Sequence, residues 1–498
     1  MYNFSYLLPL VIILPILTRR IDQCDLGFRT ILINSLGPVI LLTLSVMTYI
    51  SGVPLELSVW KFSSIMPLGL KLDILSGIIS TTVLLIGNIV FRYSIRYLQD
   101  DLERENFLRN LSLLISSVLL MLMSPNFILL IFSFFAISHF LFKLLSHLED
   151  DRSAMITAKK KLTVDRISDV FLVVASFFIF LVFKSFDFEV IFNQIQNIQV
   201  NDTNKLYLVI ATASIVISAM AKSVLTPFHH WLPNTMGAPT PVSAIMHAGI
   251  INAGGYLVIR MSPLLSQSPT VLILLAFVGS ATTFWATVVM FTQTSIKKNL
   301  AYSTIAQMGF MMFQCGVGAY SVAIIHIVGH AFYKAYAFLN SGSAVEIGRV
   351  SRYFPKNMKR PTIQHSLLIG GITVSLMLFS LKIFDQEILN DLGKVALLIV
   401  LSLAVSQVFI LSTSRSQALK VTSAMVFVYF ALTSIVSSAL VEIVSGPVSI
   451  DSNAELVILS SSVVIFITLF IIQNSLELLS RTSIGKWIYV RALNGGLK

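Results

Sequence analysis

The chain has 498 residues, of which 55% are hydrophobic and only 12% are charged, whereas roughly a quarter of the residues of a soluble domain are charged. A mean hydropathy of +0.83 and apolar stretches that reach the roughly 20 residues needed to cross a bilayer exclude a soluble protein. The two cysteines, Cys24 and Cys315, are too few for an iron–sulfur cluster or a structural zinc site.

Apolar runs between charged or Pro- and Gly-bearing loops predict about fifteen membrane-spanning helices. Their approximate limits are 1–17, 30–50, 72–98, 109–123, 126–147, 164–185, 206–226, 241–262, 268–292, 298–317, 319–341, 364–389, 393–413, 420–444 and 455–480. Arg19 and Arg20 follow the first span rather than precede it, which is the wrong order for a cleaved signal peptide. We therefore expect an all-α polytopic membrane protein that retains its first helix and has no soluble domain.

The positions of Lys and Arg predict the orientation, because cytoplasmic loops carry an excess of both. With the N-terminus outside, most basic residues fall on the cytoplasmic side, among them the run Lys159, Lys160 and Lys161. The outer side then receives only Lys61, Lys71, Lys184, Lys205, Arg260 and Lys394. The net charge of +11 is thus better explained by sorting and by contact with anionic lipid than by nucleic-acid binding. We expect the C-terminus in the cytoplasm.

Four lysines lie inside predicted spans: Lys143, Lys222, Lys334 and Lys382. A lysine at membrane depth costs several kcal/mol unless it is paired or hydrated, so it usually faces a polar pathway. Lys143 is close to a helix end, where its long side chain can reach the headgroups, and Lys382 fits either interpretation. Lys222 and Lys334 are the stronger candidates for a proton relay, because a desolvated lysine can exchange its proton near neutral pH.

Two local patterns support an internal pathway. Pro227 follows Lys222 by five residues, and proline breaks a helix. A broken helix is tolerated at membrane depth only inside protein or beside water. His326, His330 and Lys334 are spaced i, i+4, i+8, which places three titratable groups on one helix face over about 12 Å. Such a row suits proton transfer through water, although a two-histidine metal site and structural histidines remain alternatives.

The segment 222–260, KSVLTPFHHWLPNTMGAPTPVSAIMHAGIINAGGYLVIR, resembles the antiporter-like subunits of respiratory complex I and of multisubunit cation/proton antiporters. Their signature includes a broken-helix lysine, a WLP stretch, PTPVSA and a histidine on the next helix, here His247. The resemblance continues through TQTSIKKNLAYSTIAQMGF and GHAFYKAYAFLNSGSAV and covers roughly residues 70–350.

This resemblance implies two inverted five-helix repeats, each with a discontinuous helix. The single membrane domain, 1–498, would then comprise N-terminal helices at 1–110, a first repeat at 111–262, a second repeat at 263–445, and a C-terminal helix with a basic cytoplasmic tail at 446–498. The implied proton pathway runs from Lys222 in the first half through His247 and the row on the later helix. In the second half it involves Lys382 or Asp385, because Asp385 stands where the family usually has a lysine. Supporting roles are expected for Asp73, His139, Lys143, Asp169, His229 and His230, with a plain cap or ion pair equally compatible with Asp73 and Asp169.

One departure from the family concerns the fifth helix, where complex I-type subunits carry a glutamate that pairs with the broken-helix lysine. No acidic residue lies between Pro125 and Leu148, where His139 and Lys143 stand instead, so we expect this acid/base pair to be missing. The departure, together with HAGIINAGG, AQMGFMMFQCGVGAYS, AKKKLTVDRISD and AISHFLFKLL, favours the branch of energy-coupled inorganic carbon pumps.

The membrane subunits of that branch work with a soluble cytoplasmic partner that carries zinc in a site like that of a β-type carbonic anhydrase. This chain has no ligand set for a zinc-bound water, so we expect no cofactor or metal here and CO2 hydration in the partner. The expected role is proton translocation in a bacterial inner membrane, not catalysis. A cation/proton antiporter, a complex I-type pump and a non-transporting scaffold remain alternatives.

Overall fold

The computed structural model describes residues 4–17, 28–61, 67–147, 152–195, 202–342, 391–411, 415–440, 452–480 and 482–493. These residues are mostly helical, and ten segments among them are long and apolar enough to cross a membrane, so the all-α polytopic fold is confirmed while the count of about fifteen spans is not. The predicted span 364–389, with Lys382 and Asp385, lies outside the described residues.

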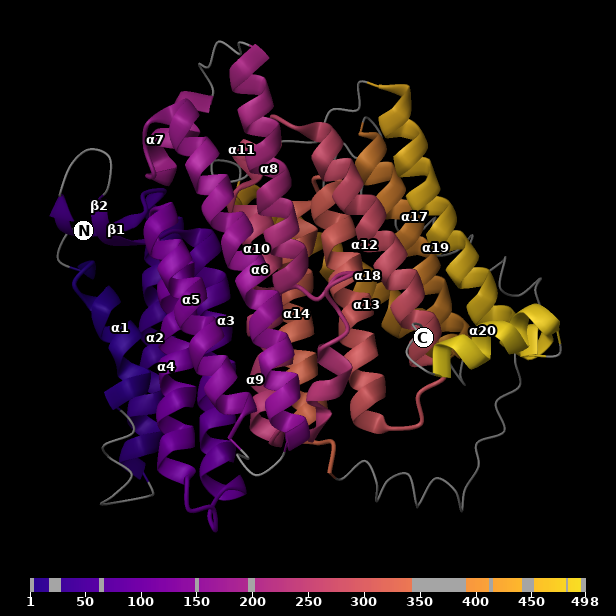
Figure 1. Cartoon of the computed structure of the whole chain (residues 1–498), viewed down its shortest axis with the longest axis horizontal. Coiled ribbons are helices and arrows are strands. Elements are labelled where there is room, and N and C mark those ends of the chain that lie inside the picture. The colour runs from indigo at the N-terminus through magenta and orange to yellow at the C-terminus, as the bar shows by residue number, and fades with distance from the viewer. Residues whose placement is uncertain are drawn as a thin grey trace. The chain divides into compact units, whose positions relative to one another are not determined.

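The elements follow one another along the chain as Figure 1 labels them. Their bounds are α1 Leu7–Leu17, α2 Phe28–Ser51, β1 Leu55–Lys61, β2 Pro67–Leu72, α3 Ile74–Tyr97, α4 Arg104–Leu122, α5 Phe127–Leu145, α6 Arg152–Phe183, α7 Phe188–Ile195, α8 Asp202–Lys222, the 3₁₀ helix η3 Leu232–Gly237, α9 Thr240–Ala248, η4 Ile250–Asn252, α10 Ala253–Arg260, α11 Ser262–Leu265, α12 Pro269–Met290, α13 Ile296–Gly316, α14 Tyr320–Leu339, α17 Leu392–Leu411, α18 Arg415–Leu440, α19 Asn453–Ser480 and α20 Ser483–Leu493.

The residue contacts divide the chain into two compact units. Unit 1 comprises Met1–Val271 and Ile327–Leu339, and unit 2 comprises Leu272–His326 and Asn340–Lys498. The boundary runs through α14, so His326 belongs to unit 2 whereas His330 and Lys334 belong to unit 1. The division into two inverted five-helix repeats stays a prediction.

Unit 1 is built around α3 to α6 and α8, in which α6 packs along α8 and α4 packs against α5 (Figure 1). Asp73 starts α3 with a capping box, because its side chain accepts the backbone N–H of Ser76 while the Ser76 hydroxyl accepts the backbone N–H of Asp73. Asn126 starts α5 by accepting the backbone N–H of Leu129. These caps satisfy backbone N–H groups at helix ends that would otherwise stay unpaired.

A short antiparallel hairpin, β1–β2, precedes α3 and was not expected. Leu55 pairs with Leu72 and Leu57 pairs with Leu70. The Lys71 ammonium of β2 lies 2.7 Å from Glu56 of β1 and 2.9 Å from Glu189 of α7, and the second contact joins the hairpin to α7. The hairpin was missed because its strands are too short to give a signal in a search for membrane-length apolar runs.

Helix α6 begins at Arg152, well before the predicted start at 164. Its 32 residues extend over roughly 48 Å at 1.5 Å per residue, more than the roughly 30 Å of a hydrocarbon core. Lys159 and Lys160 are exposed, but Lys161 is buried. The predicted span starting at 164 therefore began too late, because Lys161 is a buried residue of the helix.

Unit 2 contains a close helix pair, α12 and α13, that depends on glycine. A Cβ on Gly279 would lie 2.5 Å from the carbonyl oxygen of Gly309, and a Cβ on Gly309 would lie 2.6 Å from the carbonyl oxygen of Gly279. Small residues allow such contacts between membrane helices. Next to this pair, the Phe313 and Phe466 rings pack with a centroid distance of 5.0 Å. They belong to a core cluster that also includes Val317.

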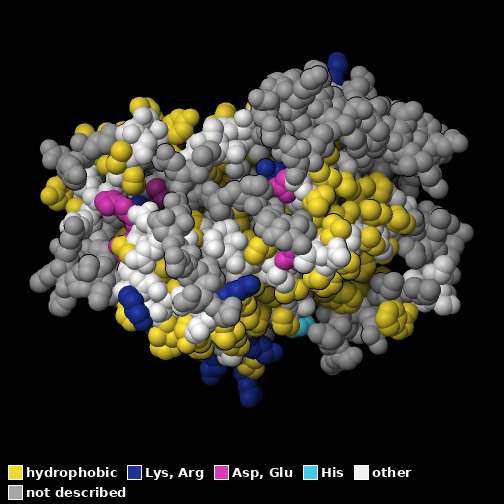
Figure 2. All heavy atoms as spheres, turned by 90° about the horizontal axis from the view of Figure 1, so that it is seen from above, with side chains coloured by type: hydrophobic (Ala, Val, Ile, Leu, Met, Phe, Trp, Pro, Cys, Tyr) yellow, Lys and Arg dark blue, Asp and Glu magenta, His cyan; other side chains and the backbone are white. Residues whose placement is uncertain are grey.

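Where the side chains are described, hydrophobic ones gather in patches on the visible face, with only scattered charged side chains among them (Figure 2). Exposed residues in the helices include Phe132, Val170 and Tyr336. In a soluble protein such wide apolar areas would cause association, whereas in a bilayer they face lipid, as a multi-pass membrane protein requires.

Candidate functional site

The predicted break after Lys222 is confirmed, because α8 ends at this residue and the next α-helix begins at Thr240. A second break, η4, interrupts the following span between α9 and α10. The two breaks pack together at Gly254, where a Cβ would lie 2.3 Å from the carbonyl oxygen of Ala219. The Ser223 hydroxyl also donates to the carbonyl oxygen of Ile251 at 2.7 Å.

The Lys222 ammonium is buried and lies among three oxygen atoms of two other helices. It donates to Ser138 Oγ of α5 at 3.1 Å, to Asp165 Oδ1 of α6 at 3.3 Å and to Asp169 Oδ1 of α6 at 3.0 Å. Its Nζ also lies 4.9 Å from the centre of the Phe134 ring. Paired carboxylates compensate the cost of burying the charge, so Lys222 does not need to reach the membrane surface.

Asp165 is shared with a second buried lysine. Lys161 Nζ lies 2.5 Å from Asp165 Oδ1 and 4.5 Å from the centre of the Trp231 ring. Lys161, Asp165, Asp169, Lys222 and Ser138 are called the Lys222 cluster below. Two lysines and two aspartates give the cluster a balanced formal charge.

Packing between α6 and α8 sets the position of this cluster. The hydroxyls of Ser168 and Ser218 are 2.8 Å apart, and Ser168 Oγ also lies 3.0 Å from the carbonyl oxygen of Ser218. This contact lies one turn from Lys222 and keeps the two helices in register. Arg166 donates to Asp169 Oδ2 at 3.2 Å, which leaves Asp169 Oδ1 for Lys222.

The expectation that the acid partner of Lys222 is missing was wrong. The acids are on α6 instead of α5, and the α5 position beside the ammonium is Ser138. Sequence reasoning named Asp169 only as a supporting residue and missed Asp165 and Lys161. The i, i+4, i+8 spacing of these three residues could have identified them, since it places them on one helix face.

His247 and Lys334 come together in unit 1. His247 is fully buried on α9, just before the second break, and its ring stacks on Phe338 of α14 with a centroid distance of 4.2 Å. Lys334 is also fully buried and interacts electrostatically with His247. Its Nζ lies 5.5 Å from the centre of the Tyr333 ring. His330, one turn earlier, is buried as well.

His326, the remaining member of the predicted row, is described within unit 2. Its Nδ1 lies 3.0 Å from Gln314 Oε1 of α13, and its ring lies 5.5 Å from that of Phe310. Among the described residues, no group of three or more His, Cys, Asp or Glu could hold a metal ion.

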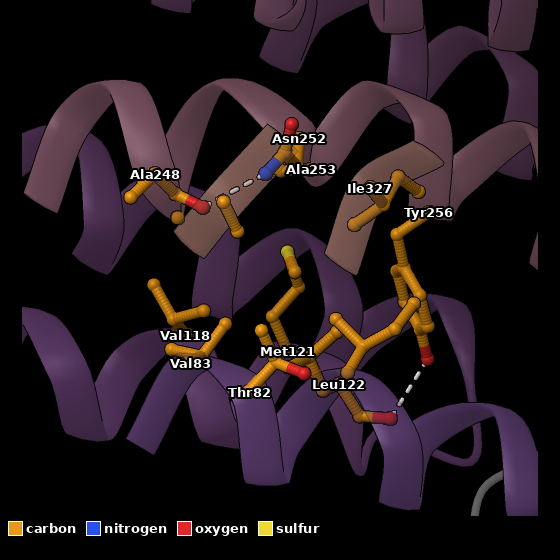
Figure 3. Close-up of a pocket in the computed structure, with 13 residues that line it drawn as sticks. Thr82, Val83, Val118, Met121, Leu122, Ala248, Asn252, Ala253, Tyr256 and Ile327 are labelled. Atoms are coloured by element: carbon orange, nitrogen blue, oxygen red, sulfur yellow. Dashed lines mark hydrogen bonds between the residues drawn. The ribbon is translucent and has the colours of Figure 1, made fainter. Parts of the chain in front are cut away.

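A cavity adjoins the second break and has room for about one water molecule. Figure 3 shows that its lining comes from α3, α4, the break and α14. Two hydrogen bonds hold the polar residues of the lining: Asn252 Nδ2 donates to the carbonyl oxygen of Ala248 at 2.8 Å, and the Tyr256 hydroxyl donates to that of Leu122 at 2.7 Å.

Asp73 forms a buried ion pair with Arg260 of α10 in addition to its cap on α3. Arg260 Nε also donates to the Tyr256 hydroxyl at 3.2 Å. These contacts fit the interpretation of Asp73 as a cap and ion pair. They tie α10, just after the second break, to the start of α3.

The other expected supporting residues are His139, Lys143, His229 and His230, and they differ in exposure. His139 and Lys143 of α5 are exposed, as expected for a lysine that reaches the headgroups. His230 is exposed, whereas His229 is buried with its ring 4.0 Å from that of His230.

Comparison with known proteins agrees with this architecture. Residues 124–411 match the family described as NADH:quinone oxidoreductase/Mrp antiporter, TM. The Mrp complex from Dietzia sp. DQ12-45-1b contains a chain of similar fold, with a TM-score of 0.63, 22% identity, and coverage of 99% of this chain and 59% of the other.

Several relatives are named as transporter or respiratory subunits. The probable inorganic carbon transporter subunit DabB1 of Halothiobacillus neapolitanus is 35% identical over 386 residues, which are 76% of this chain and 67% of that protein. DabB of Hydrogenovibrio crunogenus is 34% identical over 57% of this chain and 56% of its own length. NADH-ubiquinone oxidoreductase chain 5 of Cryptococcus neoformans is 31% identical over 69% of this chain and 53% of its own length.

The matches thus span about half to two thirds of the length of these curated relatives. They agree with the resemblance carried by the motifs around Lys222, His247 and Lys334. The chain belongs to the membrane-domain family of NADH:quinone oxidoreductases and Mrp antiporters.

Proposed function

We propose that this chain is the proton-conducting membrane subunit of an inorganic carbon uptake pump, coupled to CO2 hydration in a cytoplasmic, zinc-containing DabA-like partner. The names of the DabB relatives support the substrate. The Lys222 cluster supports proton conduction and is the observation that carries the proposal.

The cluster suits proton transfer because its basic groups can lose a proton and its acidic groups can accept one. Lys222 Nζ lies within hydrogen-bond distance of both Asp165 and Asp169. The pathway continues through His247 at the second break and through His330 and Lys334 on α14. Histidine and lysine in a desolvated site exchange protons at neutral pH, which arginine does not.

The same cluster explains how proton movement performs work. Loss of the Lys222 proton removes the cation that Asp165 and Asp169 share and leaves Asp165 with Lys161 and Asp169 with Arg166. Removing one charge from a buried ion-pair network is energetically costly. The helices α6 and α8, which carry these groups, would then favour a different arrangement. A conformational change of this kind reaches a partner docked on the cytoplasmic face and makes carbon uptake directional.

Hydration itself belongs to the partner in this proposal. It needs a zinc-bound water at an open coordination position. The described residues offer no set of metal ligands, and the role of this chain is to move and hold protons. The chain itself is a transporter subunit and not an enzyme.

A second candidate function is a cation/proton antiporter or a complex I-type proton pump. It is favoured by the similarity to NADH-ubiquinone oxidoreductase chain 5 and by the fold shared with the Mrp complex. The acid partners on α6 in place of the fifth helix favour the carbon pump, because they differ from the complex I-type arrangement.

The proposal is tested in a strain that depends on this chain for growth at ambient CO2. We expect Lys222→Met and Lys334→Met to abolish growth in ambient air and elevated CO2 to restore it, because the cell then needs no pump. Lys143→Met is the matched control and should grow normally, since Lys143 is exposed. Immunoblots of membranes confirm that each variant is inserted.

Normal growth of the inserted Lys222→Met and Lys334→Met variants in ambient air would contradict the proposal. A sodium sensitivity that elevated CO2 does not relieve would instead support the antiporter. Co-purification from membranes tests the partner: a soluble protein that contains zinc should accompany the chain, and its absence from an active complex would contradict this part.

A further inference from the structure

Lys161, at one end of the Lys222 cluster, lies beneath the Trp231 indole. Both side chains are 2% exposed, and Lys161 Nζ is 4.5 Å from the ring centre. A cation over the face of a tryptophan gains stabilisation, more so where water is excluded. Trp231 immediately precedes η3, which packs against α6, so the indole closes one side of the Lys222 cluster.

Two buried polar atoms indicate water on this side of the cluster. Trp231 Nε1 and His229 Nε2 are buried and have no hydrogen-bond partner in the part of the chain that the structure describes. Buried polar groups are almost always satisfied by protein or by ordered water. The HHWLP segment therefore provides a polar lining next to the indole instead of a purely apolar plug.

The order of Lys161 and the two aspartates along α6 gives the proton pathway a direction. Lys161 lies one turn, about 6 Å, nearer the N-terminus of α6 than Asp165, and this N-terminus is on the predicted cytoplasmic side. Lys161 contacts Asp165 and Lys222 contacts both Asp165 and Asp169. The carboxylate of Asp165 is thus the common neighbour of both lysines.

On the basis of the proposed function, we propose that Lys161 is the site where protons are released to the cytoplasmic side, that Asp165 relays them from Lys222, and that Trp231 is the lid. The Lys222 ammonium gives a proton to Asp165 Oδ1, which leaves a neutral amine and a carboxylic acid. Asp165 then protonates a neutral Lys161 amine and becomes a carboxylate again. Water admitted under the Trp231 indole accepts the proton from the Lys161 ammonium and carries it to the cytoplasm as hydronium, which leaves Lys161 neutral for the next proton.

The lid is tested by thiol labelling of the full-length chain in inverted membrane vesicles, after replacing Cys24 and Cys315 by serine. With Trp231 present, Lys161→Cys should react slowly with a membrane-impermeant maleimide added on the cytoplasmic side. With Trp231→Ala, its rate should rise toward that of Lys159→Cys, which is the exposed matched control. Trp231→Phe keeps a ring in place and should preserve protection.

Two labelling results would overturn the role of Trp231 as a lid. In the first, Lys161→Cys reacts as fast as Lys159→Cys although Trp231 is intact. In the second, Lys161→Cys stays protected in the Trp231→Ala background. The relay is tested by growth at ambient CO2, which Lys161→Met and Asp165→Asn should abolish while Lys159→Met does not. Growth of Lys161→Met, with Lys222→Met still inactive, would refute release at Lys161 and leave the proposed function intact. Growth of Lys222→Met would instead refute the proposed function.

Discussion

Unit 1 contains two buried ion-pair sites that differ in the chemistry of their basic group. In the Lys222 cluster, lysines contact two carboxylates that lie one turn apart on α6. In the second site, Asp73 contacts Arg260 while it also caps α3. Both sites connect a broken helix to an unbroken neighbour, and both are shielded from solvent.

The difference indicates which site moves protons and which one holds helices. Arginine keeps its proton under all conditions in proteins, whereas a desolvated lysine can release it. The Asp73 carboxylate also accepts hydrogen bonds from the backbone N–H and the hydroxyl of Ser76, which hold it at the start of α3. We therefore interpret the Asp73–Arg260 pair as a clamp on α10 and the Lys222 cluster as the exchanging site.

The largest expected effect comes from giving each site the basic residue of the other, in two separate variants. Lys222→Arg keeps the charge beside Asp165 and Asp169 but cannot release a proton, so growth at ambient CO2 should fall to the level of Lys222→Met. Arg260→Lys keeps a cation beside Asp73 and should retain growth. Normal growth of an inserted Lys222→Arg variant would remove the distinction between the two sites.

A smaller effect is expected from breaking the clamp. Arg260→Met or Asp73→Leu alone leaves a buried charge without its counter-ion and should cost about 3–5 kcal/mol of stability. The double variant should recover much of this loss, because neither charge remains. Thermal unfolding of the purified chain in detergent measures the stability of the two single variants and the double variant. Equal losses in the single and double variants would contradict the clamp.

The smallest effect concerns an ion pair outside the membrane-spanning segments. Asp101 Oδ2 lies 3.0 Å from His147 Nε2 at the end of α5. Partial burial raises the pKa of the Asp101 carboxyl, but its hydrogen bonds with His147 and with the backbone N–H of Glu103, together with the charge of His147, outweigh this and lower the pKa below its usual value. The stabilisation is therefore present above the pKa of the unfolded chain and is lost as the pH falls through the pKa of the folded chain.

Asp101→Asn should thus cost only about 0.2–1 kcal/mol at neutral pH, as for other surface pairs. The difference from the wild type should begin to shrink below about pH 4, near the ordinary pKa of aspartate, and vanish below the lowered pKa of the folded chain. Thermal unfolding from neutral pH to the acid limit of the folded state measures it. A cost that does not change with pH over this range would show that Asp101 acts through packing instead of charge.

The sequence predicted the break at Lys222 because proline and buried charge are local signals. It also predicted that Lys143 reaches the surface, since the position of a residue along a span is local too. It failed for Lys161 and Asp165, because a hydropathy window counts charges without assigning them to a helix face. The first three turns of α6, about residues 152–163, therefore read as a loop.

By itself, the sequence determined that the chain is a helical membrane protein with ionisable groups at membrane depth, since helix length and hydrophobicity are properties of contiguous residues. Only the tertiary structure decided which acids neutralise those groups. Asp165 and Lys222 are 57 residues apart in the chain, and their contact depends on how α6 packs along α8, which no local pattern encodes.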